Sequence, residues 1–108
     1  MENNNKILSF LGLLYRGRGI SFGDNLLNDI KSQKVNLIIY ATDSGESVKK
    51  KLLDKCGYYK VENIELFSKI DLGQALGKGQ LSAIGIYDIK ACKKIKESLK
   101  KEDANYEK

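Results

Sequence analysis

Two glycine-marked turns carry the residues that are best suited to hold a ligand. The first turn consists of Gly23, Asp24 and Asn25, and the second consists of Gly77, Lys78, Gly79 and Gln80. The first opens a predicted helix, whose free N–H groups and dipole attract phosphate, and Asn25 adds donors and an acceptor for a base edge. In the second, glycine lets the backbone approach a ligand and Lys78 can pair with phosphate. The alternative is that these glycines serve only the backbone conformation of helix ends.

Three basic side chains near these turns are further candidates: Arg16, Arg18 and Lys69. Arg16 and Arg18 precede an extended piece that leads into Gly23, and Lys69 follows a neighbouring predicted strand. All three could contact phosphates of the same ligand. A capping role serves equally well for the arginines, because positive charge stabilises the C-terminal end of a helix.

The residue inventory argues against catalysis and metal binding. The chain has no histidine, which removes Ser-His-Asp and Cys-His catalysis and the commonest general base near neutral pH. Cys56 and Cys92 stand far apart without a CxxC pair, so we expect no zinc site and interpret both thiols as small core residues. Residues 73–79 lack the signatures of a P-loop and of a dinucleotide motif. We therefore expect neither enzymatic activity nor a cofactor.

The spacing of apolar residues predicts alternating helices and strands that position the two turns. Helices are expected at residues 4–15, 23–33, 43–57, 71–76 and 88–101, and strands at residues 20–22, 35–42, 64–67 and 82–87. The second strand is apolar with little alternation, which is typical of a central strand covered on both faces. The pattern predicts an α/β fold whose sheet is covered on both faces, with both glycine turns at one end of it.

Several residues predict where the helices begin and end. Gly17 and Gly19 are expected to end the first helix, because glycine accepts the left-handed conformation. Asp43 and Glu46 have the spacing of a capping box, which explains this acidic pair without catalysis, and Gly57 is a plausible stop for the helix that follows. Three further residues are predicted at helix ends: Ser68, Gly77 and Asp88.

Length and composition fit one globular domain. We expect a single domain over residues 1–101 of the 108, followed by a frayed tail over residues 102–108. Apolar residues make up 42% and charged residues 31%, and no membrane span or signal peptide is recognisable, so we expect a cytoplasmic protein without membrane contact. The net charge of +5 attracts polyanions but also serves solubility, and we interpret the lysine clusters as solvated helix faces.

Five segments, taken in order, are similar to a known family. They are residues 10–19 (FLGLLYRGRG), 23–25 (GDN), 37–43 (LIIYATD), 54–61 (DKCGYYKV) and 71–78 (DLGQALGK). The chain resembles the ribosomal protein superfamily that binds kink-turn RNA, of the archaeal and eukaryotic large-subunit type, and especially its small bacterial YlxQ-like branch. The resemblance implies a three-layer α/β/α sandwich with a central mixed four-stranded sheet. It also implies binding to tandem sheared G·A pairs where an internal loop bends an RNA duplex, without catalysis.

The resemblance assigns contacts to both turns. The family's first contact turn places its glycine and asparagine on Gly23 and Asn25, whereas its glutamate and lysine positions hold Leu26 and Asp29 here. Asp29 in place of lysine would repel phosphate at a cost of about 1 kcal/mol, roughly tenfold in binding. The family's second contact loop, which packs against an extruded base, falls on residues 77–81. A lysine and a glutamine replace apolar residues there, so we expect more phosphate contact and less stacking.

We therefore expect a monomer that binds structured RNA, either ribosomal RNA or a kink-turn-like internal loop, with the ribosome as a further candidate partner. The alternative is a protein-interaction module of the translation machinery that keeps the fold without gripping RNA, and an exposed Leu26 would favour it. A third hypothesis, an enzyme that binds a nucleotide at the glycine turns, lacks an acid/base set.

Overall fold

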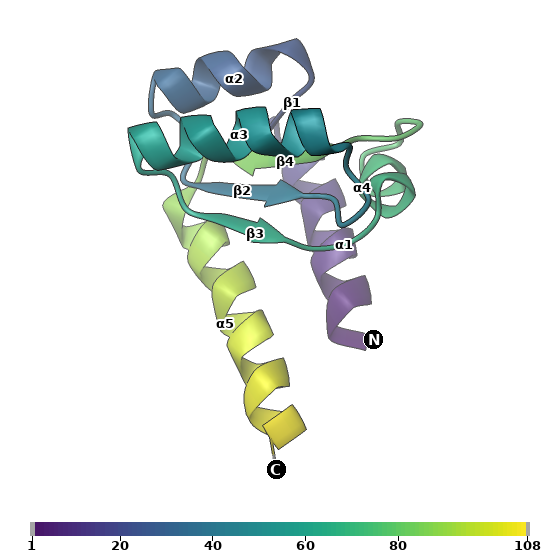
Figure 1. Cartoon of the computed structure of the whole chain (residues 1–108). Coiled ribbons are helices and arrows are strands. Elements are labelled where there is room, and N and C mark those ends of the chain that lie inside the picture. The colour runs from purple at the N-terminus through teal and green to yellow at the C-terminus, as the bar shows by residue number, and fades with distance from the viewer. Residues whose placement is uncertain (1, 108) are drawn as a thin grey trace.

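The computed structural model describes the backbone of residues 2–107 and the side chains of residues 5–100, and it shows alternating helices and strands (Figure 1). The helices are α1 (Glu2–Arg16), α2 (Asp24–Lys31), α3 (Glu46–Tyr59), α4 (Lys69–Ala75) and α5 (Ile89–Glu107). The strands are β1 (Ile20–Phe22), β2 (Leu37–Tyr40), β3 (Asn63–Glu65) and β4 (Ala83–Ile86). The predicted order of elements is confirmed; β1 has the predicted bounds, and the other three strands are shorter than expected. The predicted domain boundary at residue 101 and the frayed tail stay predictions.

The four strands form one mixed sheet in the order β1-β4-β2-β3. β4 is antiparallel to both β1 and β2, whereas β2 is parallel to β3. β1, β2 and β3 therefore point the same way, and their carboxyl ends lie at one end of the sheet together with the start of β4. We call this end, where Phe22, Tyr40 and Glu65 are the last strand residues, the first end of the sheet, and the opposite one the second end.

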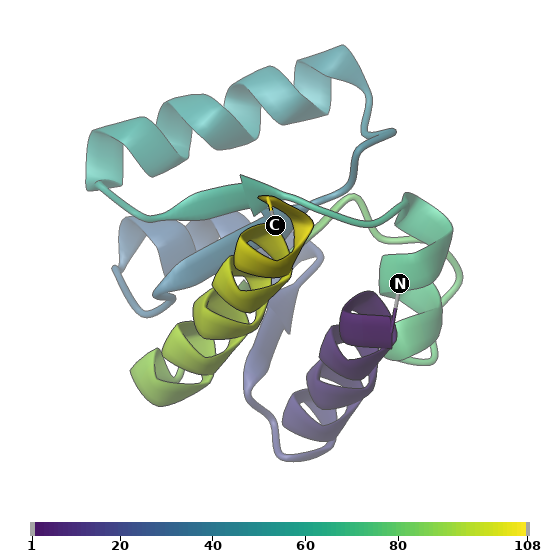
Figure 2. The same cartoon turned by 90° about the horizontal axis from the view of Figure 1, so that it is seen from below.

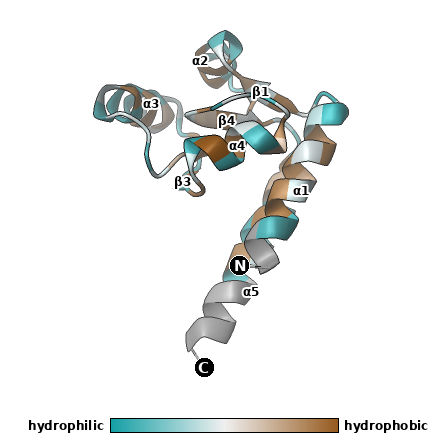
Figure 3. Ribbon diagram, turned by 90° about the vertical axis from the view of Figure 1, so that its right-hand side faces the viewer, coloured by the Kyte–Doolittle hydropathy of each residue, from teal (hydrophilic) through white to brown (hydrophobic). Residues whose placement is uncertain are grey.

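Helices cover both faces of the sheet. α2 and α3 lie side by side on one face, and α1, α4 and α5 lie on the other (Figures 1 and 3). The view from below shows α1 between α4 and α5 in that second helical layer (Figure 2). This is the three-layer α/β/α sandwich, with a central mixed four-stranded sheet, that the sequence predicted.

The core consists of two apolar clusters, one on each face of the sheet. Side chains alternate along β2, so Leu37 and Ile39 belong to the cluster under α1, α4 and α5, while Ile38 belongs to the cluster under α2 and α3. Both cysteines are free and buried, Cys92 in the first of these clusters and Cys56 in the second. Their interpretation as core residues is confirmed.

The start of α3 differs from the predicted capping box. Gly45 is the N-cap, and no side chain caps it. The Asp43 carboxylate instead accepts a hydrogen bond of 2.8 Å from the backbone N–H of Lys69, which ties the loop before α3 to the start of α4. The capping-box prediction is wrong because a partner distant in sequence takes the carboxylate.

Gly57 does not end α3, and the first helix ends where predicted, at Arg16, but without a left-handed glycine. α3 continues through Gly57, and the left-handed residue that ends it is Lys60, with φ of 58°. After α1 the left-handed residue is Arg18, with φ of 62°, and not a glycine. Gly19 instead allows a close approach, because its N–H donates to the Leu14 carbonyl at 2.7 Å and a Cβ would lie 3.1 Å from that oxygen.

Three other residues are confirmed at helix ends as predicted, whereas α5 continues to Glu107, past the predicted end of the last helix at residue 101. The Ser68 hydroxyl accepts a hydrogen bond of 3.1 Å from the Asp71 N–H, and the Asp88 carboxylate accepts one of 3.3 Å from the Lys90 N–H. Gly77 follows α4 with a left-handed φ of 71°. These caps hold because each of them involves only residues close in sequence.

Candidate functional site

The two glycine turns lie together at the first end of the sheet. Gly23 directly follows β1 and the second turn leads into β4, and these strands pair with Phe22 opposite Ile84. Contacts join the turns, because the Lys78 Nζ lies 5.3 Å from the centroid of the Phe22 ring, and Gly23 and Gln80 line one pocket. The predicted placement of the turns is confirmed; their role in binding stays a prediction.

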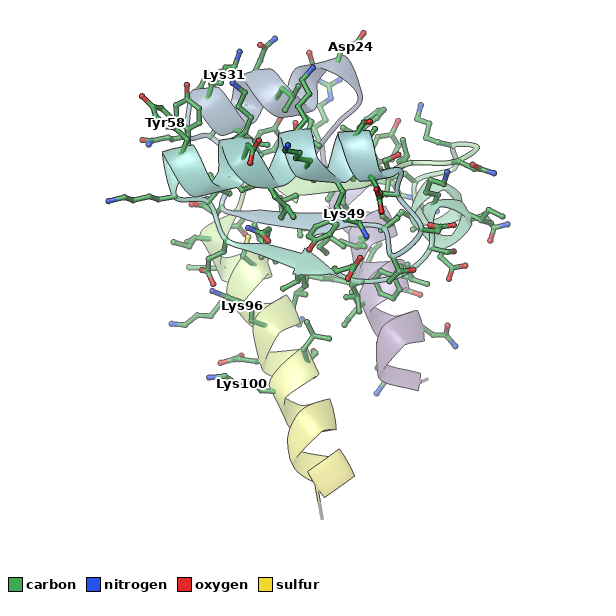
Figure 4. The ribbon with its side chains drawn as sticks, viewed as in Figure 1. Asp24, Lys31, Lys49, Tyr58, Lys96 and Lys100 are labelled. Atoms are coloured by element: carbon green, nitrogen blue, oxygen red, sulfur yellow. The ribbon has the colours of Figure 1, made fainter. Side chains whose placement is uncertain are left out.

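The first turn presents the start of α2 to solvent. Gly23 is the N-cap, with φ of 64° and ψ of −139°, a conformation that side-chain-bearing residues rarely adopt. No side chain caps this helix, and Asp24 and Asn25 are exposed. Asp24 points outward from this end of α2 in Figure 4. The first turn of α2 therefore offers its amide dipole and the Asn25 carboxamide to a ligand.

The second turn is held close against α4. Gly77 has a left-handed φ of 71°, and the Lys78 N–H donates to the Gly73 carbonyl at 2.7 Å. A Cβ on Gly73 would overlap the carbonyl group of Gly79. Glycine at position 73 is thus required for the turn to lie where it does, since no side chain fits between helix and turn.

Lys78 reaches back over two aromatic rings at the same end. Its Nζ lies 5.5 Å from the Tyr15 centroid and 5.3 Å from the Phe22 centroid, within the range of a cation–π interaction. The two rings meet edge to face, with centroids 5.6 Å apart. Tyr15 belongs to α1, so this contact joins the second turn to α1 and β1. The sequence analysis did not single out either aromatic residue.

An apolar pocket of about 370 Å³ opens beside the two turns. It is lined by residues of α2, α3 and the segment before β4: Gly23, Leu26, Leu27, Val48, Lys51, Leu52, Gln80, Leu81, Ser82 and Ala83. Among these described residues the one charged side chain is Lys51. Val48 is 47% exposed although it was predicted to face the core, and Lys51 was predicted to lie on a solvated face. Their three-residue spacing, which places them on one side of a helix, is the signal that was available.

The three flanking basic residues are not all brought to this end. Lys69 lies there, because its carbonyl accepts a hydrogen bond of 3.1 Å from the Leu81 N–H. Arg16 lines a separate groove between α1 and α4 with Asp71. Arg18 precedes β1 and therefore lies toward the second end of the sheet, away from Gly23. The structure thus groups Lys69, but not Arg18, with the glycine turns.

Leu26 is a core residue and not a surface anchor. It is 6% exposed and belongs to the cluster under α2 and α3. It packs closely on β4, since a Cβ on Gly85 would lie 2.9 Å from the Leu26 Cδ1. The exposed Leu26 that would have favoured a protein-interaction module is therefore absent.

Asp29 is bound within the fold. Its Oδ2 accepts hydrogen bonds from the Ser21 hydroxyl at 2.6 Å and from the Tyr87 hydroxyl at 2.5 Å. Partial burial opposes its ionisation, but these two hydrogen bonds and the charge of Lys34 hold the pKa of Asp29 below its ordinary value. Burial, together with the bond to Asp29, raises the pKa of Tyr87. The carboxylate thus joins α2 to β1 and to the end of β4.

Other kinds of site have little support in the part of the chain that the structure describes. No group of three or more metal-ligating side chains occurs among the described residues. No helix in that part is long and apolar enough to cross a membrane. Burial raises the pKa of both thiols, that of Cys92 to about 11, so neither is poised as a nucleophile at neutral pH.

Sequence relatives share most of their length with this chain. It is 36% identical over 96 residues to a protein of Enterococcus faecium named "RNA-binding protein YlxQ", covering 88% of this chain and 92% of that one. It is 32% identical over 79 residues to the protein of the same name from Bacillus subtilis (strain 168), covering 72% of this chain and 79% of that one.

Solved structures and a family model give the same grouping. A protein of unknown function from Bacillus halodurans superposes with a TM-score of 0.81 at 34% identity, covering 88% of this chain and 97% of that one. The Giardia lamblia 15.5kD RNA binding protein shares the fold, with a TM-score of 0.73 at 21% identity over 96% of this chain and 90% of that one. The model of the ribosomal protein L7Ae/L30e/S12e/Gadd45 family matches residues 7–97. This chain is therefore a member of the ribosomal protein L7Ae/L30e/S12e/Gadd45 family.

Proposed function

We propose that this protein is a non-enzymatic binder of structured RNA, and that its ligand is a kink-turn-like internal loop, in ribosomal RNA or elsewhere. The observation that carries the proposal is the meeting of two exposed glycine turns with an apolar pocket at the first end of the sheet. Two relatives that match over most of their length are named RNA-binding proteins, which supports the same class of ligand.

Each part of the site suits one part of a bent RNA strand. Backbone amides at the start of α2 suit a phosphate, and Asn25 suits a base edge. Lys78 and Lys69 belong to the same end of the sheet and supply positive charge for neighbouring phosphates. An extruded base fits the pocket between α2 and α3, where Leu27 and Val48 provide apolar contacts.

The two departures from the family pattern alter the expected preference. Leu26 is buried and presents no polar group to a guanine edge. The Asp29 carboxylate is engaged by Ser21 and Tyr87, so the repulsion of phosphate expected from it is reduced. Recognition then depends on Asn25, the backbone and the pocket, and we expect shape to count for more than sequence.

A gel-shift titration tests the proposal with two RNA duplexes, one with a kink-turn and one in which Watson–Crick pairs replace its sheared G·A pairs. We expect the first duplex to bind about tenfold more tightly or better, since each mismatched contact typically costs more than 1 kcal/mol. Asn25→Ala should reduce this preference, whereas Lys50→Ala, on an exposed position of α3 outside the pocket, should not.

Equal binding of both duplexes would exclude recognition of the motif. Absence of RNA binding, together with a stoichiometric protein partner that survives nuclease treatment, would instead support the interaction-module hypothesis. The burial of Leu26 removes the feature that favoured that hypothesis.

A further inference from the structure

A second pocket, of about 680 Å³, lies at the second end of the sheet. It is formed by the segments that precede β2 and β3 and by the start of α5: Gln33, Val35, Asn36, Tyr59, Lys60, Val61, Glu62, Ile89, Lys90, Cys92, Lys93 and Lys96. These segments lie at the opposite end of the sheet from the glycine turns, and the linings of the two pockets share no residue. The pocket is therefore separate from the site proposed above.

The lining of this second pocket is strongly basic. Four lysines against one glutamate leave a charge of +3. The glutamate, Glu62, is itself paired with Lys96 at 2.7 Å, so Lys60, Lys90 and Lys93 face no other carboxylate within the lining. Lysines continue along the same side of α5, and Lys96 and Lys100 point the same way in Figure 4. Such a row suits a chain of phosphates.

Aromatic and amide groups accompany the lysines. Tyr59 lines the pocket and meets Tyr58 edge to face, with centroids 4.8 Å apart. Tyr58 is 78% exposed and projects from the same end of α3 in Figure 4, and Ile89 at the mouth of the pocket is 67% exposed. Tyr59 is half-buried and packs on the cluster under α2 and α3, so only part of its ring faces the lysines, whereas Tyr58 is open to solvent. Rings beside lysines suit a single nucleic acid strand, because bases stack on the rings while phosphates pair with the cations.

We propose that this second pocket binds a single strand of RNA, with a base against Tyr59 and the adjoining phosphates along Lys60, Lys90 and Lys93. The side-chain carboxamide of Gln33 stands at the rim as a partner for a base edge. An acidic peptide would use the same charge but would leave the aromatic surface without a role. The proposal does not depend on kink-turn recognition, because an unpaired strand needs no internal loop.

Fluorescence anisotropy with a labelled oligouridylate tests the proposal directly. K90E/K93E should bind about tenfold or more weakly, and the slope of log affinity against log salt should fall by about 1.4, because each single-strand phosphate that a lysine neutralises adds about 0.7 to the slope. Y59L, which keeps an apolar side chain, should weaken binding about fivefold or more because a base can no longer stack on the ring. Thermal unfolding of each variant checks that it is folded, which we expect of K90E/K93E because both lysines are exposed, and of Y59L because leucine keeps the apolar contact with the cluster under α2 and α3.

A charge-matched control separates this pocket from the rest of the surface. K6E/K50E makes the same change in net charge at exposed positions outside the second pocket and should bind like wild type. No kink-turn RNA is used, so the result can be interpreted whether or not the proposed function holds. Unchanged binding by K90E/K93E, equal weakening in K6E/K50E, or equal competition by polyglutamate would each overturn the proposal.

Discussion

Lys78 is the residue at which position and charge combine most directly. Its ammonium group is held over Tyr15 and Phe22 and still lies on an exposed turn. An exposed cation–π contact contributes about 0.5 to 1 kcal/mol. This attraction restricts the rotamers of the long Lys78 side chain. A phosphate that approaches the first end therefore meets a charge that is already placed.

We predict that Lys78→Gln weakens binding of a kink-turn duplex by about tenfold and lowers the salt slope by about 1, as expected when one phosphate is no longer neutralised. Filter binding over a series of salt concentrations measures both quantities. Lys50→Gln, an equivalent change at an exposed site on α3, is the matched control. A slope that stays the same in Lys78→Gln would show that this lysine does not contact phosphate.

Asp29 is the residue whose role the structure changes most. Its lowered pKa means that the folded chain stabilises the ionised form of Asp29 more than the unfolded chain does. Its contribution to stability is therefore fully present above the unfolded pKa of about 3.9 and is lost as pH falls through the lower folded pKa. The hydrogen bonds from Ser21 and Tyr87 are the source of that contribution.

We predict that Asp29→Asn lowers the free energy of unfolding by about 1 kcal/mol at neutral pH, and that the difference from wild type shrinks below about pH 4. Urea unfolding at a series of pH values measures it. Asp54→Asn, at an exposed position of α3, removes the same charge without these partners. A difference for Asp29→Asn that does not depend on pH would contradict the assignment.

At the scale of elements, the contact between α4 and the turn that follows it determines the shape of the candidate site. Gly73 leaves no room for a side chain under Gly79, and its carbonyl accepts the Lys78 N–H. Any added atom at position 73 must move either the helix or the turn. The placement of Lys78 and Gln80 thus depends on Gly73, which contacts the backbone of the turn and not the ligand.

We predict that Gly73→Ala lowers the free energy of unfolding by about 1 to 3 kcal/mol through overpacking, and also weakens RNA binding. Gly57→Ala is the contrasting control, because Gly57 lies inside α3 with open space around its Cβ position. It should raise stability by about 0.5 to 1 kcal/mol and leave binding unchanged. Urea unfolding and anisotropy measure the two effects, and a stable Gly73→Ala with normal binding would contradict the argument.

Helix ends show which local features sequence could and could not predict. Ser68 and Gly77 were predicted because their caps use neighbouring residues only. Asp43 was misassigned because Lys69, distant in sequence, competes for its carboxylate. Gly57 was misassigned because the buried face of α3, which carries Leu52 and Cys56, outweighs the weak local preference of one glycine.

In the candidate site, too, the features set by nearby residues could be predicted and those set by distant residues could not. Both turns and their shared end of the sheet could be predicted from glycine positions and from the alternation of elements. The pocket could not, since Val48 has the apolar spacing of an inner helix face and yet is 47% exposed, lining the pocket with Gln80 and Leu81 from a segment distant in sequence. Arg18 was grouped with Gly23 although the predicted strand at residues 20–22 separates them, because long arginine side chains were expected to reach past this short strand.

At the scale of the whole molecule, one thiol lies in each half of the core. Cys56 is 1% exposed in the cluster under α2 and α3, and Cys92 is 1% exposed in the cluster on the opposite face. Alternation of residues predicted both layers, but the sheet order could not be predicted, because strand pairing depends on contacts between distant segments.

We predict that both thiols resist a thiol reagent at pH 8 in the native protein, because burial raises the pKa of each and blocks access. In rising urea the two should become reactive over the same concentrations at which circular dichroism reports unfolding, as expected of a small two-state domain. Mass spectrometry of labelled peptides measures each site separately. Reaction of Cys56 well before Cys92 would instead show that the α2 and α3 layer opens by itself.

The position of β4 has a consequence for how the chain is made. β4 is the last strand to be synthesised, yet it stands between β1 and β2, and β1 has no other neighbour in the sheet. In a nascent chain β2 and β3 can pair early, but β1 stays unpaired until residue 86 has left the ribosome. A product that stopped before residue 83 would leave open the edges of β1 and β2 that β4 otherwise covers, and open edges favour aggregation, so truncated translation products should be insoluble or rapidly degraded.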